Sequence, residues 1–343
     1  MKIKKIGIVS LSSGLLGEAF VDHQIAIGLE RLISLGLEVE FLPNSRKGIT
    51  YLQAHPEARA EDLLQAMADD SIDMILCAIG GDDTYRLAPY LFDQDALAKV
   101  AKQKVFLGFS DTTANHFMFH KLGIKTFYGQ AFLPDIAELS DQMLEYTAHY
   151  FEELIHKGRI TEIRPSDVWY PNREDFGVSQ VGTEMPAYQN NGFELLQGPT
   201  KFEGEILGGC LESIDQFFNN ARHADSVAIA NKYQLFPSLE DWRGKILLLE
   251  TSEEKTAPDL FRKMIQTLAD FGIFEVLSGL LVGKPQDEAY YEAYKDILVQ
   301  EIGNANLPIL YNLNVGHAMP RCIVPFGVPA FVDAVEQRIR FEV

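Results

Sequence analysis

Short apolar runs alternate with helical patterns through the first half of the sequence, and this alternation constrains the fold more than any other feature. Five runs have the length and composition of buried strands: IGIVSL (6–11), VEFLP (39–43), MILCAI (74–79), VFLGF (105–109) and TFYGQ (126–130). The segments between them carry a helical period, at 18–35, 59–69, 85–101, 112–121 and 139–157. Such alternation is typical of a parallel sheet covered by helices. We therefore expect a doubly wound α/β domain that binds its ligands at the carboxyl ends of the strands.

The pattern changes after about residue 160. The segment 164–192, RPSDVWYPNREDFGVSQVGTEMPAYQNNG, is rich in Pro, Asn, Asp and Gly and keeps no period, which indicates a linker or a binding loop. Beyond it, the strand-like runs FELLQG, EGEILGG, KILLLE and GLLVG alternate with helical patterns at about 210–219, 258–271 and 289–303, and three more strand candidates lie within 308–343. We expect an N-terminal domain at 1–163, the linker at 164–192 and a mixed α/β domain at 193–343.

Charge and cysteine content limit the partners and the compartment. The 343 residues include 30 Lys and Arg against 49 Asp and Glu, a formal net charge of -19, which repels nucleic acid and anionic lipid. No apolar stretch approaches the ~20 residues of a membrane-spanning helix, and the start, MKIKKIGIVSL, is typical of a first strand rather than a signal peptide. Cys77, Cys210 and Cys322 lie in separate apolar segments, as buried free thiols do in a reducing compartment. We expect a cytoplasmic protein with no nucleic-acid or membrane partner.

The sequence GFSDTT, residues 108–113, places Ser110 at a corner between a strand and a helix. A hydroxyl there could cap the helix, as could its neighbours. Phosphate binding is disfavoured, because the loop has few glycines and Asp111 would repel an anion. A strand-to-helix corner can also present a nucleophile, with the next backbone N–H facing a developing oxyanion. The pattern is Gly-x-Ser-x-Thr and not the Gly-x-Ser-x-Gly elbow, so the corner alone leaves cap and nucleophile open.

A serine nucleophile needs a base. Among the eight histidines, His317 in LNVGHAMPR follows a strand-like run and precedes a proline, a loop position from which a side chain can enter a cleft. A structural histidine would fit the same position. His116 and His120 have the spacing of metal ligands on a helix, but the apolar segment HFMFH favours core packing for both.

The base needs a carboxylate that orients it. Glu250 ends the apolar strand KILLLE, where a carboxylate without a partner is costly to bury. Glu253 and Glu254, just beyond it, have the pattern of solvated loop charges. Three strand ends, at Ser110, Glu250 and His317, could therefore converge as nucleophile, orienting carboxylate and base.

The run AIGGDDTYRL, residues 78–87, joins a strand to paired glycines. Without side chains, glycines let backbone N–H groups approach a ligand. Gly81 is thus a candidate oxyanion donor beside the backbone N–H of Asp111, and Asp82 and Asp83 are candidate substrate-binding residues. A tight turn between strand and helix would account for the same glycines.

Taken together, these segments resemble the LD-carboxypeptidase family of serine peptidases, and within it the microcin C immunity branch. The resemblance runs through IGIVS, AIGGDDTYRLAPYL, LGFSDTTANHF, GEILGGCLESI, KILLLETSEE, GLLVGKPQDE and NVGHAMPR, in the order of the family. It implies a flavodoxin-like N-terminal domain, a smaller β-rich C-terminal domain, a homodimer, and no metal or other cofactor. Position by position, it implies a triad of Ser110, Glu250 and His317, with Gly81 and Asp111 supplying the oxyanion donors.

The departures from the family bear on the substrate. The loop IGGDDTY replaces the Arg-Gly-Gly-Tyr-Gly type of the cell-wall enzymes, which disfavours a murein tetrapeptide, and Cys210 replaces the usual Asn after a glycine pair. The immunity branch stacks a nucleobase on a tryptophan, for which Trp169 is the equivalent candidate; a hydrophobic plug would also fit. The resemblance therefore implies cleavage of an amide next to a free carboxylate in an aminoacyl or peptidyl nucleotide. The alternatives are a murein LD-carboxypeptidase and a two-lobed protein that binds a small ligand without catalysis.

Overall fold

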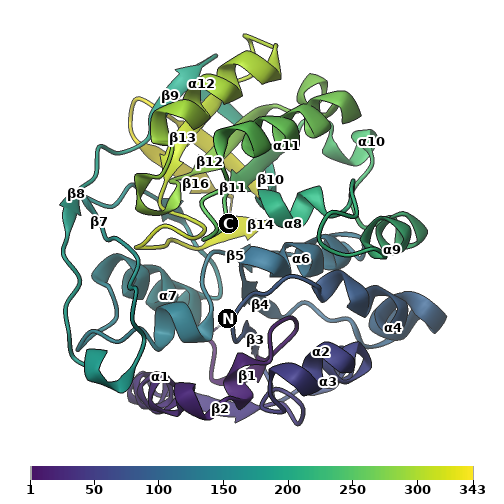
Figure 1. Ribbon diagram of the computed structural model, residues 1–343, viewed down its shortest axis with the longest axis vertical. Helices are drawn as coiled ribbons and strands as arrows, with labels where there is room; N and C mark the ends of the chain where they lie inside the picture. The colour runs from purple at the N-terminus through teal and green to yellow at the C-terminus, as the bar shows by residue number, and fades with distance from the viewer. Residues whose placement is uncertain (1, 343) are drawn as a thin grey trace.

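The computed structural model describes residues 2–342, with the N-terminal half below the C-terminal half in the view of Figure 1. The first half is built on a six-stranded sheet of order β14-β5-β4-β3-β1-β2, in which every pairing is parallel except that of β14 with β5. Its strands are β1 Lys5–Val9, β2 Glu38–Phe41, β3 Met74–Cys77, β4 Val105–Gly108, β5 Thr126–Tyr128 and β14 Val324–Phe326. The expected doubly wound α/β domain is confirmed.

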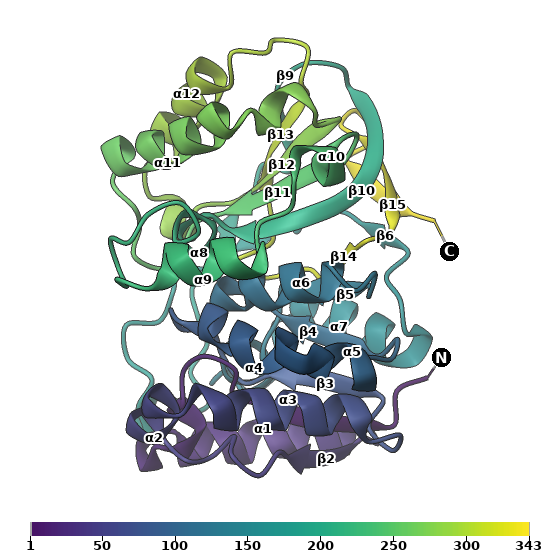
Figure 2. The same ribbon diagram turned by 90° about the vertical axis from the view of Figure 1, so that its right-hand side faces the viewer.

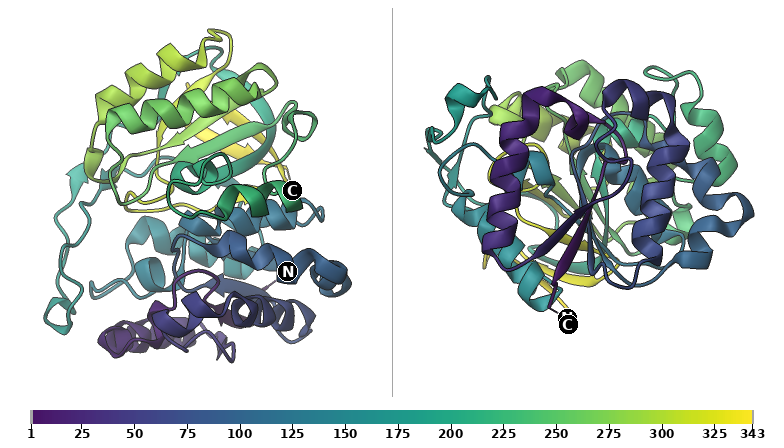
Figure 3. Two further views of the ribbon diagram at one scale, coloured as in Figure 1. Left: turned by 45° about the vertical axis from the view of Figure 1, so that its right-hand side comes forward. Right: turned by 90° about the horizontal axis from the view of Figure 1, so that it is seen from below.

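Helices cover both faces of this sheet, with α1 and α7 on one side and α2 to α4 on the other (Figure 1 and the right-hand view of Figure 3). They are α1 Asp22–Ser34, α2 Ile49–Ala54, α3 Pro56–Ala68, α4 Ala88–Phe92, α5 Ala96–Val100, α6 Thr113–His120 and α7 Glu145–Lys157. The single helix expected at 85–101 is wrong. It is broken between α4 and α5, where Gln94 and Asp95 adopt φ of 58° and 56°, values that a right-handed helix excludes.

The second half is built on an eight-stranded sheet of order β6-β16-β15-β10-β11-β12-β13-β9. Its centre, β10 to β13, is parallel and its two edges are antiparallel. The strands are β6 Glu162–Ile163, β9 Glu194–Gln197, β10 Lys201–Cys210, β11 Ile246–Glu250, β12 Gly279–Gly283, β13 Ile309–Leu313, β15 Pro329–Asp333 and β16 Arg338–Phe341. Four strands follow residue 308 where three were expected, because β14 leaves this half and completes the first sheet.

The helices of the second half lie on the outer face of its sheet and at its border with the first half (Figure 2). They are α8 Leu211–Asp215, α9 Ser226–Tyr233, α10 Leu239–Trp242, α11 Pro258–Phe271 and α12 Tyr291–Ile302. In α11 the buried residues are Phe261, Met264, Ile265 and Leu268, the helical spacing of one face. No helix within residues 2–342 has the length and the apolar run needed to cross a bilayer.

A continuous hydrophobic core joins the two halves. Phe117 of α6 lies 5.7 to 6.1 Å, ring centre to ring centre, from Phe217, Phe236 and Trp242 of the second half. The three cysteines are buried and unpaired, as their apolar surroundings predict. Because both sheets pack into the same core, their positions relative to each other are fixed.

The segment 164–192 is more ordered than its composition predicts. It forms a two-stranded hairpin of β7 Val168–Trp169 and β8 Tyr188–Gln189, at the left of the molecule in Figure 1. The backbone N–H of Tyr170 donates to the carbonyl of Met319 at 3.0 Å, so the segment runs beside the loop that carries His317.

Candidate active site

Ser110 occupies a strained turn at the carboxyl end of β4. Its φ is 63°, in the left-handed region that a residue with a side chain rarely adopts. The chain passes from β4 through a single 3-10 turn, Ser110–Thr112, into α6. A Cβ added to Gly80 would lie 2.7 Å from both Cβ and Oγ of Ser110, so only glycine fits beside the serine. This turn presents the hydroxyl at the sheet edge, as the nucleophile interpretation requires, and the side chain of Ser110 makes no capping bond there.

His317 and Glu250 come from the second half of the chain. Glu250 is the last residue of β11 and is 1% exposed, and His317 lies in the loop that leads from β13 to β14. The Nδ1 atom of His317 is 2.7 Å from Oε2 of Glu250, and the backbone N–H of His317 donates to the same oxygen at 3.2 Å. Gly316, with φ of 88°, permits this approach, because a Cβ there would lie 2.3 Å from Oε2 of Glu250. The carboxylate therefore orients the imidazole.

The relay is completed by the serine. The Nε2 atom of His317 lies 3.1 Å from Oγ of Ser110, so hydroxyl, imidazole and carboxylate from three distant segments form one chain of hydrogen bonds. Its geometry is that of a nucleophile, a base and an orienting acid. The three residues singled out in the sequence meet in space; their catalytic roles stay a prediction.

The segments that hold these three residues match models of a known protein family. Residues 6–129 match the model described as "LD-carboxypeptidase N-terminal domain", and residues 203–332 match the "LD-carboxypeptidase C-terminal domain". The chain belongs to the LD-carboxypeptidase family. The two matched regions hold the strand end of Ser110 and those of Glu250 and His317 respectively.

Relatives within the LD-carboxypeptidase family differ in name. The MccF-like protein from Streptococcus pneumoniae, solved in complex with AMP, is 63% identical, with a TM-score of 0.98 and 99% coverage of both chains. The microcin C7 self-immunity protein MccF of Escherichia coli is 25% identical over 80% of this chain and 75% of its own; a structure of MccF contains aspartyl sulfamoyl adenosine. The Bacillus subtilis protein named "Probable murein peptide carboxypeptidase" is 25% identical over 89% and 83%.

Tyr128 of β5, which the sequence did not single out, links two members of the relay by hydrogen bonds. Its hydroxyl donates to Oε1 of Glu250 at 2.6 Å and accepts the backbone N–H of Ser110 at 3.0 Å. Burial, followed by the nearby carboxylate, holds the pKa of Tyr128 well above 10.0, so the hydroxyl keeps its proton. Both oxygens of Glu250 are therefore satisfied, and the phenol links the carboxylate to the strained turn.

A second group that the sequence did not single out, Arg321, holds the backbone of His317 in place. Its Nη2 donates to the carbonyl of His317 at 2.9 Å, and Nη1 pairs with Asp135 at 2.9 Å. The guanidinium lies 4.7 Å from the ring centre of Phe109, and the imidazole of His317 lies 5.1 Å from the same ring. These contacts are tertiary, so no local sequence signal predicts them.

The glycine loop, Gly80 and Gly81, lies against Ser110. A Cβ at Gly80 would be 3.4 Å from the backbone N of Asp111, and one at Gly81 would be 2.2 Å from Oγ of Ser12, which leaves no room for a side chain at either position. Asp111 accepts the Ser12 hydroxyl at 2.6 Å and the backbone N–H of Thr84 at 2.8 Å. Burial raises the pKa of Asp111 to about 6. The loop is thus packed rigidly beside the serine, and the oxyanion roles of Gly81 and Asp111 stay a prediction.

The candidate substrate-binding residues differ in their surroundings. The carboxylate of Asp83 is buried and faces Arg59 at 2.5 Å, so it is engaged inside the protein. Asp82 is 56% exposed and lies 3.3 Å from Nε2 of His223, beside a cavity of about 190 Å³ that Gly81 also lines. Trp169 is half-buried and stacks on Tyr188 with ring centres 5.1 Å apart. Asp82 is the more accessible of the two aspartates.

Cys210 brings a thiol close to the relay. Donor atoms of Cys210, Glu250 and His317 lie within 4.8 Å of one another, a set of ligand types that zinc accepts. Two of the three are already hydrogen-bonded to each other, and the thiol donates to Glu212 at 3.3 Å. Burial raises the pKa of the thiol well above 9.0, so it holds its proton. The three donors are therefore engaged in hydrogen bonds with one another and with Glu212.

His116 is a core residue, as its apolar surroundings predict. Its ring nitrogens contact Oγ1 of Thr126 at 2.7 Å and the carbonyl of Gly108 at 3.1 Å. Burial lowers its pKa to about 3. Both nitrogens are therefore engaged in hydrogen bonds within the fold.

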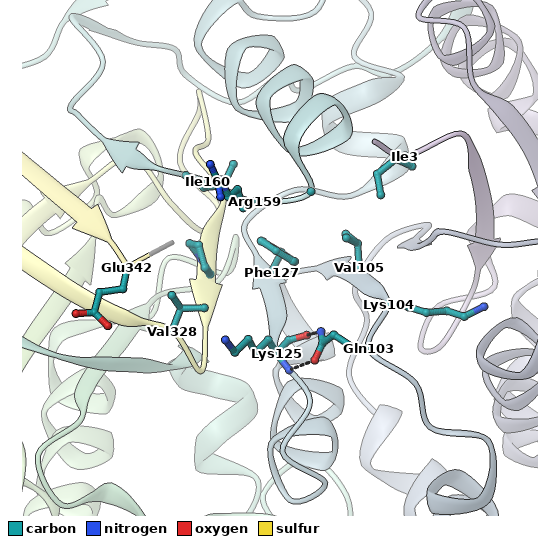
Figure 4. Close-up of a pocket in the computed structure, with 12 residues that line it drawn as sticks. Ile3, Gln103, Lys104, Val105, Lys125, Phe127, Arg159, Ile160, Val328 and Glu342 are labelled. Carbon is teal, nitrogen blue, oxygen red and sulfur yellow. Dashed lines mark hydrogen bonds between the residues drawn. The ribbon is translucent and has the colours of Figure 1, made fainter. Parts of the chain in front are cut away.

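A separate cavity of about 290 Å³ opens at the opposite edge of the first sheet (Figure 4). It lies at the amino ends of β4 and β5, beside Val105 and Phe127, and the side chain of Gln103 spans to the backbone of Lys125 at 3.1 Å. Ligands of doubly wound sheets bind at the carboxyl ends of the strands. The relay, and not this cavity, is therefore the candidate site.

Replacing Tyr128 by Phe tests the phenol's role. The change leaves a carboxylate oxygen and a backbone N–H without their buried partner, so we expect the free energy of unfolding to fall by about 1–3 kcal/mol and turnover to slow. Denaturant unfolding and kcat measure the two effects. Tyr90→Phe, at a position 43% exposed, is the matched control and should change neither. Equal behaviour of the two variants would contradict the role given to Tyr128.

Proposed function

We propose that the protein is a serine hydrolase that cleaves an acyl–nitrogen bond next to a free carboxylate in an aminoacyl or peptidyl nucleotide. The observation that carries the proposal is the hydrogen-bonded relay of Ser110, His317 and Glu250 at a strained turn. Membership of a peptidase family supports the reaction class. The AMP bound to the Streptococcus pneumoniae relative, which shares 63% of its sequence with this chain, supports a nucleotide in the substrate.

The proposed reaction has two halves. Ser110 Oγ attacks the carbonyl carbon while its proton passes to Nε2 of His317, and Glu250 keeps Nδ1 protonated and the ring in place. His317 then returns the proton to the leaving nitrogen as the carbon–nitrogen bond breaks, which leaves an ester on Ser110. Water attacks this ester with the same base, and the serine recovers its proton. Backbone N–H groups of Gly81 and Asp111 would stabilise the negative oxygen in both halves.

The test is a comparison of two substrates. We expect purified protein to release aspartate from aspartyl sulfamoyl adenosine and to leave murein tetrapeptide intact, with mass spectrometry measuring both. Trimming of the tetrapeptide alone would replace the proposal by murein peptide cleavage, the function that the name of the Bacillus subtilis relative favours. No reaction with either, and no labelling of Ser110 by a fluorophosphonate, would favour a ligand-binding protein.

A further inference from the structure

A second carboxylate lies at the catalytic nitrogen of His317. Oε2 of Glu253 is 3.0 Å from Nε2, the same atom that lies 3.1 Å from Oγ of Ser110. The other ring nitrogen already faces Glu250 at 2.7 Å. The imidazole is therefore placed between two carboxylates, one behind it and one at the position from which it must act.

This arrangement is incompatible with a free base. An ionised carboxylate only accepts hydrogen bonds, so an Nε2 atom bonded to Glu253 carries a hydrogen, and Nδ1 carries another toward Glu250. The ring is then an imidazolium, which cannot take the proton of Ser110. Burial lowers the pKa of His317, but Glu250 and then Glu253 outweigh it and raise it to about 10. The hydrogen bond from His317 lowers the pKa of Glu253 to about 2, so this carboxylate is ionised.

The other charged and titratable groups around the imidazole do not change this conclusion. Arg321, bonded to the carbonyl of His317, opposes its protonation, but Asp135 pairs with that guanidinium. The thiol of Cys210 holds its proton. Arg222 attracts Glu253, but it is paired with Glu254. The remaining strong influences on the imidazole are the two glutamates.

The side chain of Glu253 is free to move away from His317, and that of Glu250 is not. The side chain of Glu253 is 65% exposed and lies in the loop between β11 and α11, whereas that of Glu250 is fully buried. Exposed side chains change rotamer in about nanoseconds. The structure therefore contains a fixed carboxylate that orients the imidazole and a movable one that keeps the imidazole protonated by raising its pKa.

We propose that Glu253 acts as a clamp on His317: its carboxylate holds the imidazole protonated until substrate binds. The clamp opens when the substrate offers the Glu253 carboxylate another cation, an ammonium group on the carbon next to the scissile carbonyl. The carbonyl carbon must lie about 3 Å from Oγ of Ser110, and this ammonium is one carbon away, so it falls beside Glu253. When Glu253 exchanges the imidazolium for the ammonium, the pKa of His317 falls, the ring releases its Nε2 proton to water, and Nε2 becomes a free base where and when the substrate is bound. The inference rests on the proposed function and adds to it a requirement for a free α-amine.

The first experiment measures the effect of Glu253 on the pKa of His317 and needs no substrate. NMR titration of the His317 ring protons in the substrate-free protein should give a pKa lower by about one unit or more in Glu253→Gln, a roughly tenfold rise in free imidazole at neutral pH. The same change at Glu240, whose side chain is 82% exposed and pairs with Arg243, is the matched control and should leave the titration unchanged. An unchanged titration in Glu253→Gln would overturn the clamp.

The second experiment measures selectivity with a matched pair of substrates. Succinyl sulfamoyl adenosine lacks only the α-amine of aspartyl sulfamoyl adenosine. We expect the wild-type kcat/KM to favour the amine by about tenfold or more, and Glu253→Gln to remove most of this preference by accelerating the succinyl compound. A preference that survives in Glu253→Gln would refute the ammonium exchange and leave the proposed function standing. Wild-type protein that hydrolyses neither compound would refute the proposed function, and the titration would still decide the clamp.

Discussion

Replacing Ser110 by Ala should abolish turnover of aspartyl sulfamoyl adenosine, with a loss of about 10³-fold or more in kcat. Removal of a nucleophile in a triad typically costs several orders of magnitude, because the remaining groups stabilise the oxyanion but cannot form the ester. The substitution also removes the hydroxyl that His317 contacts at 3.1 Å, while the backbone of the turn keeps its bond to Tyr128. Steady-state kinetics with mass-spectrometric detection of aspartate measures the loss.

The fold should survive this change, because an alanine occupies less space at the crowded contact with Gly80. Far-ultraviolet circular dichroism and the unfolding midpoint check this point. Ser34→Ala, on the exposed side of α1, is the matched control and should keep full activity. Ser110→Ala with near-wild-type kcat would show that the hydroxyl is not the nucleophile.

Replacing Glu250 by Gln should lower kcat by about 10³- to 10⁴-fold. The amide has the shape of the carboxylate but no charge, so it cannot stabilise the imidazolium that forms when His317 takes the serine proton. Its NH₂ group also favours a ring whose Nδ1 is unprotonated, which places the hydrogen on Nε2, where the lone pair is needed. The rate should stay low across the pH range in which the protein is folded, which a full pH–rate profile will measure.

Glu240→Gln is the control for this substitution as well, since it removes the same charge from a side chain that is 82% exposed. It should change kcat by less than about twofold. If Glu250→Gln retained wild-type kcat at neutral pH, the carboxylate would be a structural partner of Tyr128 and not a member of the relay.

The sequence predicts the relay well, for a topological reason. Ser110 and Glu250 each follow a run of apolar residues that had to be buried strands, and His317 follows a third. Parallel strands bring their carboxyl ends to one edge of a sheet, so polar residues at those ends are candidates to meet. What pattern alone could not supply was the pairing across two sheets, for which the resemblance to the family was needed.

Other parts of the site depend on tertiary contacts that leave no local pattern. Tyr128 lies in an apolar strand, where a tyrosine is indistinguishable from a core residue until its hydroxyl finds Glu250. Glu253 has the sequence context of a solvated loop charge, and it is indeed exposed. Its carboxylate nevertheless turns toward His317, because the loop after β11 and the loop after β13 lie side by side.

Two features of the fold, β14 and the break between α4 and α5, also leave no local signal in the sequence. β14, Val324–Phe326, is three residues long and contains a proline, so it has neither the length nor the period of a recognisable strand. It forms because β5 offers an open edge to which it can pair. The break between α4 and α5 leaves no local signal, because the apolar spacing continues across it.

The path of the chain around β14 means that the two halves are not separable modules. The loop that holds His317 starts from the second sheet at β13 and ends in the first sheet at β14, so it is fixed to both sheets. A fragment confined to the first half would keep Ser110, lose His317, and expose the unpaired backbone of β5 to self-association. Reconstitution from two pieces would thus require insertion of β14 beside β5, so assembly of the relay and completion of the first sheet are coupled.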